Sequence, residues 1–440
     1  MFLDWWLTLS MLLGGLLLLM VLGMPVAFAF FTVNAIGAFV FLGGIYGIEQ
    51  LVINTTSALT SFTLVPIAMF MIMGEVMFRS GIANDVMDSL DKWFGKLRGR
   101  LAFMAVGGGV LFSTLTGNSM GSVALLGSSL VPEMEKRGYK KPMTLGPILG
   151  SAGLAIMIPP SALAVVLGVI AELSIGRLLI AIIVPGLLMA VLYAAYIYIR
   201  CTIEPDIAPT FDVPHTPMKE KLSSTVINIF PVGIIVFAVV GFIFLGIATP
   251  TEAAASGAVA TILLAAIKRR LTIRSFSSSM FESSLISVMI LLIVAAAIAF
   301  SQLLAFTGVT YGLMDAVLSL PFSPKWIVMA MVLSIVVLGM FMGPLPIMLI
   351  TLPIFVPVVI QFGFDPLWFA VLFLIAIETG STSPPLGAGL FVMRAVAPKG
   401  TTMGQIYSAA VPFLICDFVA LGLIFFFPEI VTWPVSLMFD

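Results

Sequence analysis

Charge is what this sequence lacks most. Only 9% of its 440 residues are charged, against about 25% expected of a soluble globular domain, and 61% are apolar. Most of the chain is therefore expected to lie within a lipid bilayer. Apolar runs of about 18 residues or more are long enough to span a hydrocarbon core, and only helices satisfy their own backbone there. Such runs include 179–199, 226–247 and 285–305. The sequence predicts an all-α polytopic membrane protein.

Other scarcities exclude whole classes of function. The formal net charge is −1, and no basic face can be drawn, so nucleic acid is not an expected partner. The only cysteines, Cys201 and Cys416, lie far apart and support neither a disulfide framework nor a thiolate metal site. A membrane serine protease would need a base, yet the one histidine, His215, lies in a polar linker. A phosphate-binding Gly-x-x-x-x-Gly-Lys-Ser/Thr loop is also absent. We therefore expect no enzyme activity, no cofactor and no direct use of ATP.

The two halves of the chain repeat each other at an offset of 225 residues. Prolines and glycines fix backbone geometry, so their recurrence indicates a shared architecture. Four matches carry the repeat: Pro25 with Pro250, Val131-Pro132 with Val356-Pro357, Gly138-Tyr139 with Gly363-Phe364, and Pro159-Pro160 with Pro384-Pro385.

Basic residues do not follow the repeat. Four lie in 136–141, whereas the equivalent 361–366 holds none and carries Asp365. Four also lie in 268–274, whereas the equivalent 43–49 holds none. Because basic segments stay in the cytoplasm, the two halves must have opposite orientations. We expect a multi-pass protein of the bacterial inner membrane with both termini in the periplasm.

The pattern predicts the same layout in each half. Residues 1–200 and 223–440 form the inverted repeats, joined by a polar cytoplasmic linker at 201–222. Only about 36 apolar residues separate the basic segments 92–100 and 136–141, which suits two half-length helices with a polar tip at mid-depth. We expect re-entrant hairpins at about 101–135 and 326–360, and proline-broken helices at about 143–170 and 367–393.

The breaks have a chemistry of their own. Consecutive prolines remove amide donors and unwind the helix, which exposes carbonyl oxygens beside small hydroxyl side chains. Oxygens of this kind suit a desolvated Na⁺, and half-helix N-termini favour an anion. Proline kinks and small residues also allow close helix packing without any ligand. Two tips and two breaks in matched positions favour an ion-binding function.

An ordered series of motifs runs through both halves: Thr116-Gly117-Asn118-Ser119, Leu130-Val131-Pro132-Glu133-Met134-Glu135-Lys136-Arg137-Gly138-Tyr139, Ile158-Pro159-Pro160-Ser161, Thr249-Pro250-Thr251-Glu252-Ala253-Ala254, Gly363-Phe364-Asp365-Pro366 and Ser383-Pro384-Pro385-Leu386-Gly387. This series resembles the large membrane subunit of TRAP transporters, the tripartite ATP-independent periplasmic carriers. The resemblance implies an elevator-type, Na⁺-driven permease with scaffold and transport domains. It also implies two partners, a small four-helix membrane subunit and a periplasmic binding protein that delivers an organic anion.

The resemblance also implies which residues bind ions. The first site would use Thr116, Gly117, Asn118, Ser119, Ser151, Gly153 and Pro159, and the second Met342, Gly343, Thr379, Ser381, Thr382 and Ser383. Candidate substrate contacts are Asn118, Ser161, Glu378 and Arg394.

Two residues depart from the family pattern. Gly343 stands where an Asp is common, and Glu378 stands where a neutral residue is usual. A carboxylate at this depth is costly, so Glu378 is an ion ligand or proton carrier, unless a backbone amide or hydroxyl satisfies it.

Other charges have simpler interpretations. Glu252 follows Thr249 and Pro250 in the form of a helix capping box, and Arg394 can extend its charge to the membrane surface. No partner of Glu75 or Asp417 is identifiable from sequence. Two alternatives to the tripartite function stay open: a stand-alone Na⁺- or H⁺-coupled carrier, and a non-catalytic membrane scaffold.

Overall fold

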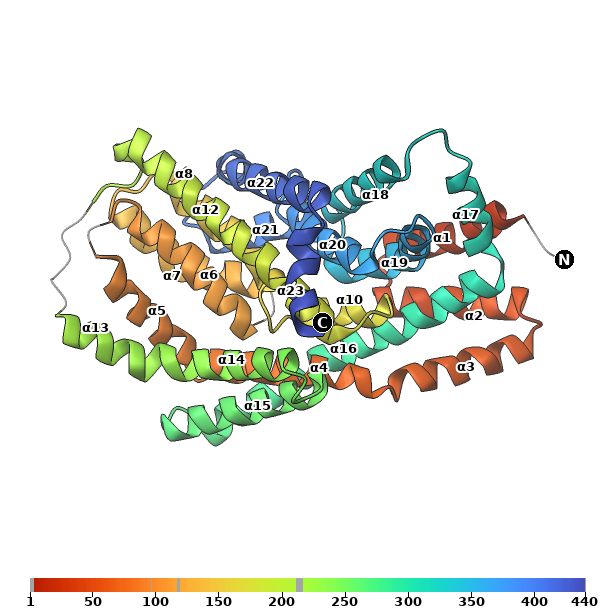
Figure 1. Cartoon of the computed structure of the whole chain (residues 1–440), viewed down its shortest axis with the longest axis horizontal. Helices are drawn as coiled ribbons and strands as arrows, with labels where there is room; N and C mark the ends of the chain where they lie inside the picture. Colours follow the sequence, from red (N-terminus) through yellow and green to blue (C-terminus); the bar gives the residue numbers. More distant parts are fainter. Residues whose placement is uncertain (1–3, 96, 117–118, 211–216, 440) are drawn as a thin grey trace.

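The fold is built from helices packed side by side (Figure 1). The structure, a computed structural model, describes residues 4–95, 97–116, 119–210 and 217–439, and the side chains of these except 111–116 and 439. Every regular element within these ranges is a helix, so the all-α class is confirmed. Seven of the described helices are long and apolar enough to cross a membrane, or eight if one bent pair counts as a span.

The first half runs from α1 to α12. Its elements are α1 (Trp5–Val21), α2 (Val26–Phe41), α3 (Ile45–Leu59), η1 (Phe62–Leu64), α4 (Val65–Arg79), α5 (Ile82–Phe94), α6 (Arg100–Thr116), α7 (Ser119–Lys136), α8 (Lys141–Ala152), α9 (Leu154–Met157), α10 (Ala162–Ile170), α11 (Ile175–Ala181) and α12 (Ile183–Ile203). Short helices η2 (Pro205–Ile207) and α13 (Met218–Ser224) follow, and a π-helical turn, η3 (Thr225–Ile229), leads into the second half.

The second half reproduces the helix order of the first. Its elements are α14 (Phe230–Phe244), α15 (Pro250–Ile267), α16 (Ile273–Phe306), α17 (Val309–Leu318), α18 (Pro324–Gly339), α19 (Pro344–Gln361), α20 (Pro366–Ser381), α21 (Ala388–Val396), α22 (Met403–Phe426) and α23 (Glu429–Phe439). Adding 225 to the bounds of α7 gives those of α19, and adding 225 to the start of α8 gives the start of α20.

Capping chemistry sets where some of these helices begin. Thr249 and Glu252 form the predicted capping box at the start of α15, with Pro250 as the first helical residue, so that prediction is confirmed. Asp365 accepts a hydrogen bond from the Leu367 amide at 2.8 Å and thereby caps α20.

Contacts with α22 show that the two halves run in opposite directions. The Lys141 ammonium, at the start of α8, donates to the Thr401 hydroxyl, just before α22. The Trp368 indole, at the start of α20, donates to the Ile424 carbonyl at the far end of α22. The 24 residues of α22 span about 36 Å. α8 and α20 therefore start at opposite ends of one helix, and the hairpins α6–α7 and α18–α19 lie in opposite halves of the molecule (Figure 1).

Ion pairs bring the predicted cytoplasmic segments to the same end. Lys92 lies 3.0 Å from Glu220, which ties α5 to the segment after the linker. Lys140 lies 2.9 Å from Glu204, which ties the α7–α8 turn to the end of α12. Lys140 with Arg200 also holds the pKa of the Glu204 carboxyl below its usual range.

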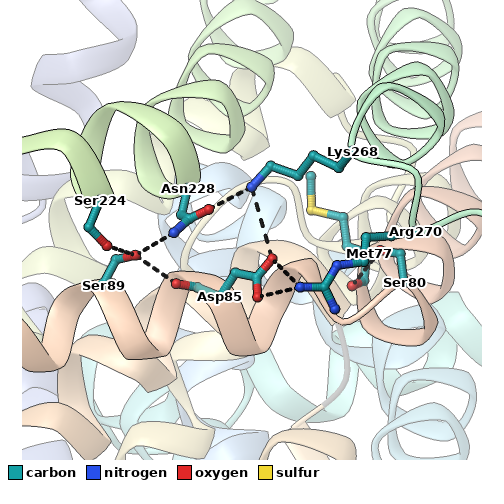
Figure 2. Close-up of polar contacts among 8 residues, drawn as sticks. All are labelled: Met77, Ser80, Asp85, Ser89, Ser224, Asn228, Lys268 and Arg270. Carbon is teal, nitrogen blue, oxygen red and sulfur yellow. Dashed lines mark hydrogen bonds and ion pairs between the residues drawn. The ribbon is translucent and has the colours of Figure 1, made fainter.

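A polar network attaches α5 to the helices beside it (Figure 2). The Asp85 carboxylate lies 3.2 Å from the Arg270 guanidinium and 4.0 Å from the Lys268 ammonium. Lys268 also donates to the Asn228 side chain at 2.7 Å. Burial lowers the pKa of Lys268, and the Asp85 carboxylate opposes that shift. The network therefore joins α5, the helix before hairpin α6–α7, to η3 and to the turn between α15 and α16.

The inverted arrangement predicts opposite accessibility for two matched residues. Lys136 and Gln361 end α7 and α19 and are both exposed. In a background with Cys201 and Cys416 replaced by alanine, Lys136→Cys and Gln361→Cys should react with an impermeant maleimide from opposite faces of sealed vesicles. Labelling of both introduced thiols from the same face would contradict the inverted fold.

Candidate functional site

The first break separates α9 from α10. α9 ends at Met157, Ile158 is extended, and the Pro159–Pro160 bond is cis. Ser161 then caps α10 by accepting a hydrogen bond from the Ala164 amide at 3.3 Å. The helix directions before and after the break differ by 49°. The unwound segment supplies no proline amide donors, so its carbonyl oxygens lose their usual helical partners.

The second break follows α20, which ends at Ser381, and the Pro384–Pro385 bond is also cis. Hydroxyl groups line the last turn. Ser381 donates to the Glu378 carbonyl at 2.9 Å, Ser383 to the Thr379 carbonyl at 2.6 Å, and Thr379 to the Ile375 carbonyl at 2.8 Å. Each hydroxyl proton is used within the helix, so the oxygen lone pairs remain available to a cation.

The two broken helices meet at Gly153, which lies between α8 and α9, and at Glu378 of α20. A Cβ atom on Gly153 would lie 2.8 Å from Cγ of Glu378, so the glycine leaves room for that side chain. The two residues are repeat equivalents, because 153 plus 225 is 378. Equivalent residues touch only near the axis that relates two repeats. The contact therefore places Glu378 at the centre of the inverted pair.

The Glu378 carboxylate is buried without a hydrogen bond. Its side chain is 2% exposed, and neither oxygen has a partner among the residues that the structure describes. A buried unpaired carboxylate costs several kcal/mol, so this position favours a cation or a proton on the acid.

The hairpins pack against the breaks through glycines. Gly109 of α6 lies against Ser151 of α8, and Gly339 of α18 lies against Gly380 of α20, where a Cβ on Gly339 would be 2.8 Å from Cα of Gly380. The halves are also interlocked, because α7 contacts α21 of the other repeat and α19 contacts α10.

The structure places the predicted site residues unevenly. Gly117 and Asn118 lie outside the described residues, as does the side chain of Thr116. The following side chains are buried: Ser119, Ser151, Ser161, Glu378, Thr379, Ser381, Thr382 and Ser383. Pro159 lies in the first break, and Met342 and Gly343 lie half-buried in the turn between α18 and α19. Arg394 is exposed on the last turn of α21, and within the described ranges no ion pair or hydrogen bond joins it to the buried set.

Gly343 has space for a side chain. A Cβ atom there would meet nothing within 4 Å, and its φ of −71° is available to any residue. The glycine is therefore not required by backbone geometry, and an aspartate would fit at this tip.

Sequence reasoning missed one buried pair. Asp417 of α22 is 4% exposed, and the Tyr193 hydroxyl of α12 donates a hydrogen bond to its Oδ1. The tyrosine lies 224 residues away in the chain, which is why no partner was identifiable. The available signal was a carboxylate within an apolar span.

Comparisons with known proteins agree on one family. A family model described as "Tripartite ATP-independent periplasmic transporter, DctM component" matches residues 13–430. The chain is 28% identical to the ectoine TRAP transporter large permease protein TeaC of Halomonas elongata, over 96% of this chain and 97% of that protein. It is 31% identical to the C4-dicarboxylate TRAP transporter large permease protein DctM of Pseudomonas aeruginosa, over 87% and 88% respectively.

A solved structure has a similar fold. The crystal structure of the Alcanivorax borkumensis YdaH transporter aligns with a TM-score of 0.62 at 15% identity, over 88% of this chain and 89% of that one. At this identity the likeness concerns the fold alone.

The contact between Gly153 and Glu378 predicts a steric effect. Gly153→Ala should displace the Glu378 side chain and lower the free energy of unfolding by about 1–3 kcal/mol, the usual cost of overpacking. Thermal unfolding of the purified protein measures this. Gly422→Ala is the matched control, because a Cβ there meets nothing within 4 Å. Equal effects of the two substitutions would contradict the packing described.

The same contact predicts a rescue. Gly153→Glu alone should place two carboxylates at the axis and destabilise the protein further. Adding Glu378→Gly returns one carboxylate and one glycine to the same place, so the double variant should recover most of the lost stability. If the changes in the free energy of unfolding caused by the two single substitutions simply add in the double variant, the two residues are not in contact at the axis.

Proposed function

The chain belongs to the family of DctM components of tripartite ATP-independent periplasmic transporters, and on that premise we propose that it is the translocating subunit of a Na⁺-coupled importer of small carboxylates. The observation that carries the proposal is the meeting of the two broken helices at Gly153 and Glu378. The contact brings the Glu378 carboxylate, which has no hydrogen-bond partner among the described residues, and the hydroxyls of the last turn of α20 to the junction of α8 and α9 in the other half. These are ligands that a hard cation prefers.

Na⁺ entry would supply the energy. Each charge that moves inward down the membrane potential contributes about 2.3 kcal/mol per 100 mV. Two Na⁺ ions with one monovalent anion carry one net charge. Because about 1.4 kcal/mol corresponds to a tenfold ratio, such a cycle sustains well over tenfold accumulation.

Glu378 replaces the ligand that the second tip lacks. Gly343 has no side chain to offer at the second tip. Glu378 supplies a carboxylate from α20, the helix that precedes the second break. We propose that Glu378 is an ion ligand. The Pseudomonas aeruginosa relative described above is named for C4-dicarboxylates, so we propose a carboxylate substrate here too.

The proposed assembly has three parts. A small four-helix membrane subunit would pack on this chain, and a periplasmic binding protein would deliver the substrate. The protein would lie in the bacterial inner membrane with both termini in the periplasm. The hairpins and breaks would move together as a transport domain against a fixed scaffold, which is an elevator motion.

Uptake in reconstituted vesicles tests the assembly. With a small membrane subunit and a periplasmic binding protein added to this chain, a Na⁺ gradient should drive substrate accumulation, and omission of the binding protein should abolish it. Equal uptake without any binding protein would contradict the tripartite function and favour a carrier that acts alone.

Glu378→Gln tests the ion ligand. The substitution keeps the shape and removes the charge, so it should raise the Na⁺ concentration for half-maximal uptake about tenfold or more, as expected for loss of a charged ligand. Glu49→Gln changes an exposed carboxylate of α3 and should leave the Na⁺ dependence unchanged. A wild-type Na⁺ dependence in a folded Glu378→Gln protein would remove Glu378 from the site.

A further inference from the structure

A cavity of about 330 Å³ lies between the first hairpin and two helices of the other wall. Its lining comes from α7 on one side, including Gly121 and Ser128, and from α4 and α16 on the other, including Glu75 and Ser283. Gly121 is the third residue of α7 and lies next to the hairpin tip. The cavity thus runs along the hairpin between the tip and the end where the basic residues gather.

The charge around this cavity is negative. Glu75 is the one charged side chain that lines it within the described part of the chain. Arg79 pairs with Glu75 and also lies 3.8 Å from Glu282 of α16. Two carboxylates thus share one guanidinium. A dianion that enters here meets an excess of negative charge, whereas a cationic group meets an acceptor.

A buried hydroxyl in the cavity wall lacks a partner. Ser283 is 1% exposed, and its Oγ has no hydrogen bond among the described residues. Ser287, one helical turn later, does have a partner, because its hydroxyl donates to the Ser283 carbonyl at 2.6 Å. An orphan hydroxyl beside a carboxylate is a ready site for a ligand with polar hydrogens.

We propose that this cavity binds the substrate in transit, and that the substrate carries a cationic nitrogen as well as a carboxylate. The inference rests on the transport function proposed above and narrows its substrate class to zwitterions. Glu75 accepts hydrogen bonds from the cationic nitrogen, and Ser283 completes its polar contacts. The apolar remainder of the lining covers the carbon chain.

Cysteine protection tests the occupant directly. Ser128 lines the cavity and is exposed, and among the described residues its hydroxyl bonds only to the carbonyl of Leu125 in its own helix. Ser128→Cys, in a background without Cys201 and Cys416, should react with a maleimide. Two probes share a four-carbon chain with a carboxylate at one end, and they differ at the other. The zwitterion 4-aminobutyrate should slow labelling at a concentration at least about tenfold lower than the dianion succinate.

Glu75→Gln should reverse this preference. The variant removes the acceptor and leaves Arg79 without its nearest partner, so succinate should then protect better than 4-aminobutyrate. Glu282→Gln is the matched control, because Glu282 faces the same arginine but does not line the cavity, and it should retain the wild-type order. Better protection by succinate with Glu75 intact, an unchanged order in Glu75→Gln, or no protection by either probe overturns the proposal.

Measurements of Na⁺-driven substrate uptake distinguish a failure of the cavity proposal from a failure of the proposed transport function. Na⁺-driven uptake without any protection of the Ser128→Cys thiol keeps the transport function and rejects the cavity as its substrate site. Protection of that thiol without Na⁺-driven uptake keeps the zwitterion site and rejects the transport function.

Discussion

The whole arrangement depends on one constraint: inside a bilayer, an unwound backbone must be enclosed by protein. Two Pro-Pro segments interrupt helices in the core of this chain, and each interruption frees carbonyl oxygens that lipid cannot satisfy. The fold encloses them by packing the two broken helices against each other. Gly153, between α8 and α9, lies against the Glu378 side chain of α20, and the backbone of Gly339 in α18 lies against the backbone of Gly380 in α20. Glycine is needed at these positions because of the close approach.

Interlocking of the two repeats follows from this enclosure. The second helix of each hairpin contacts the helix that follows the break of the other repeat, α7 with α21 and α19 with α10. Neither half can therefore enclose its own break alone. The network around Asp85 belongs to a different part of the molecule, where α5 joins η3 and the turn between α15 and α16 (Figure 2). A moving body that holds both breaks and a fixed body that holds the base of α5 would divide the molecule as an elevator requires.

Much of this fold was predictable because local chemistry and the repeat carry it. Proline positions, the offset of 225 and the absence of basic residues at 361–366 are all properties of the printed sequence, as is the capping box at Thr249. The contacts of the site were not predictable. Glu378 against Gly153, Tyr193 on Asp417 and Arg79 between two glutamates depend on how helices cross in three dimensions. No periodicity along one helix encodes a partner on another.

An axis of inverted repeats forces the two halves to differ where they touch. A residue on the axis faces its own equivalent, so two identical large side chains would collide and two carboxylates would repel one another. The pair at 153 and 378 resolves both conflicts with one glycine and one glutamate. Because the axis holds a single carboxylate, the two proposed ion sites would differ chemically. The half that carries Glu378 is also the half whose tip has Gly343 instead of an acid. The second half therefore has one acid instead of two in this region. That acid, Glu378, lies in the packed helix α20 and not in the turn that holds Gly343.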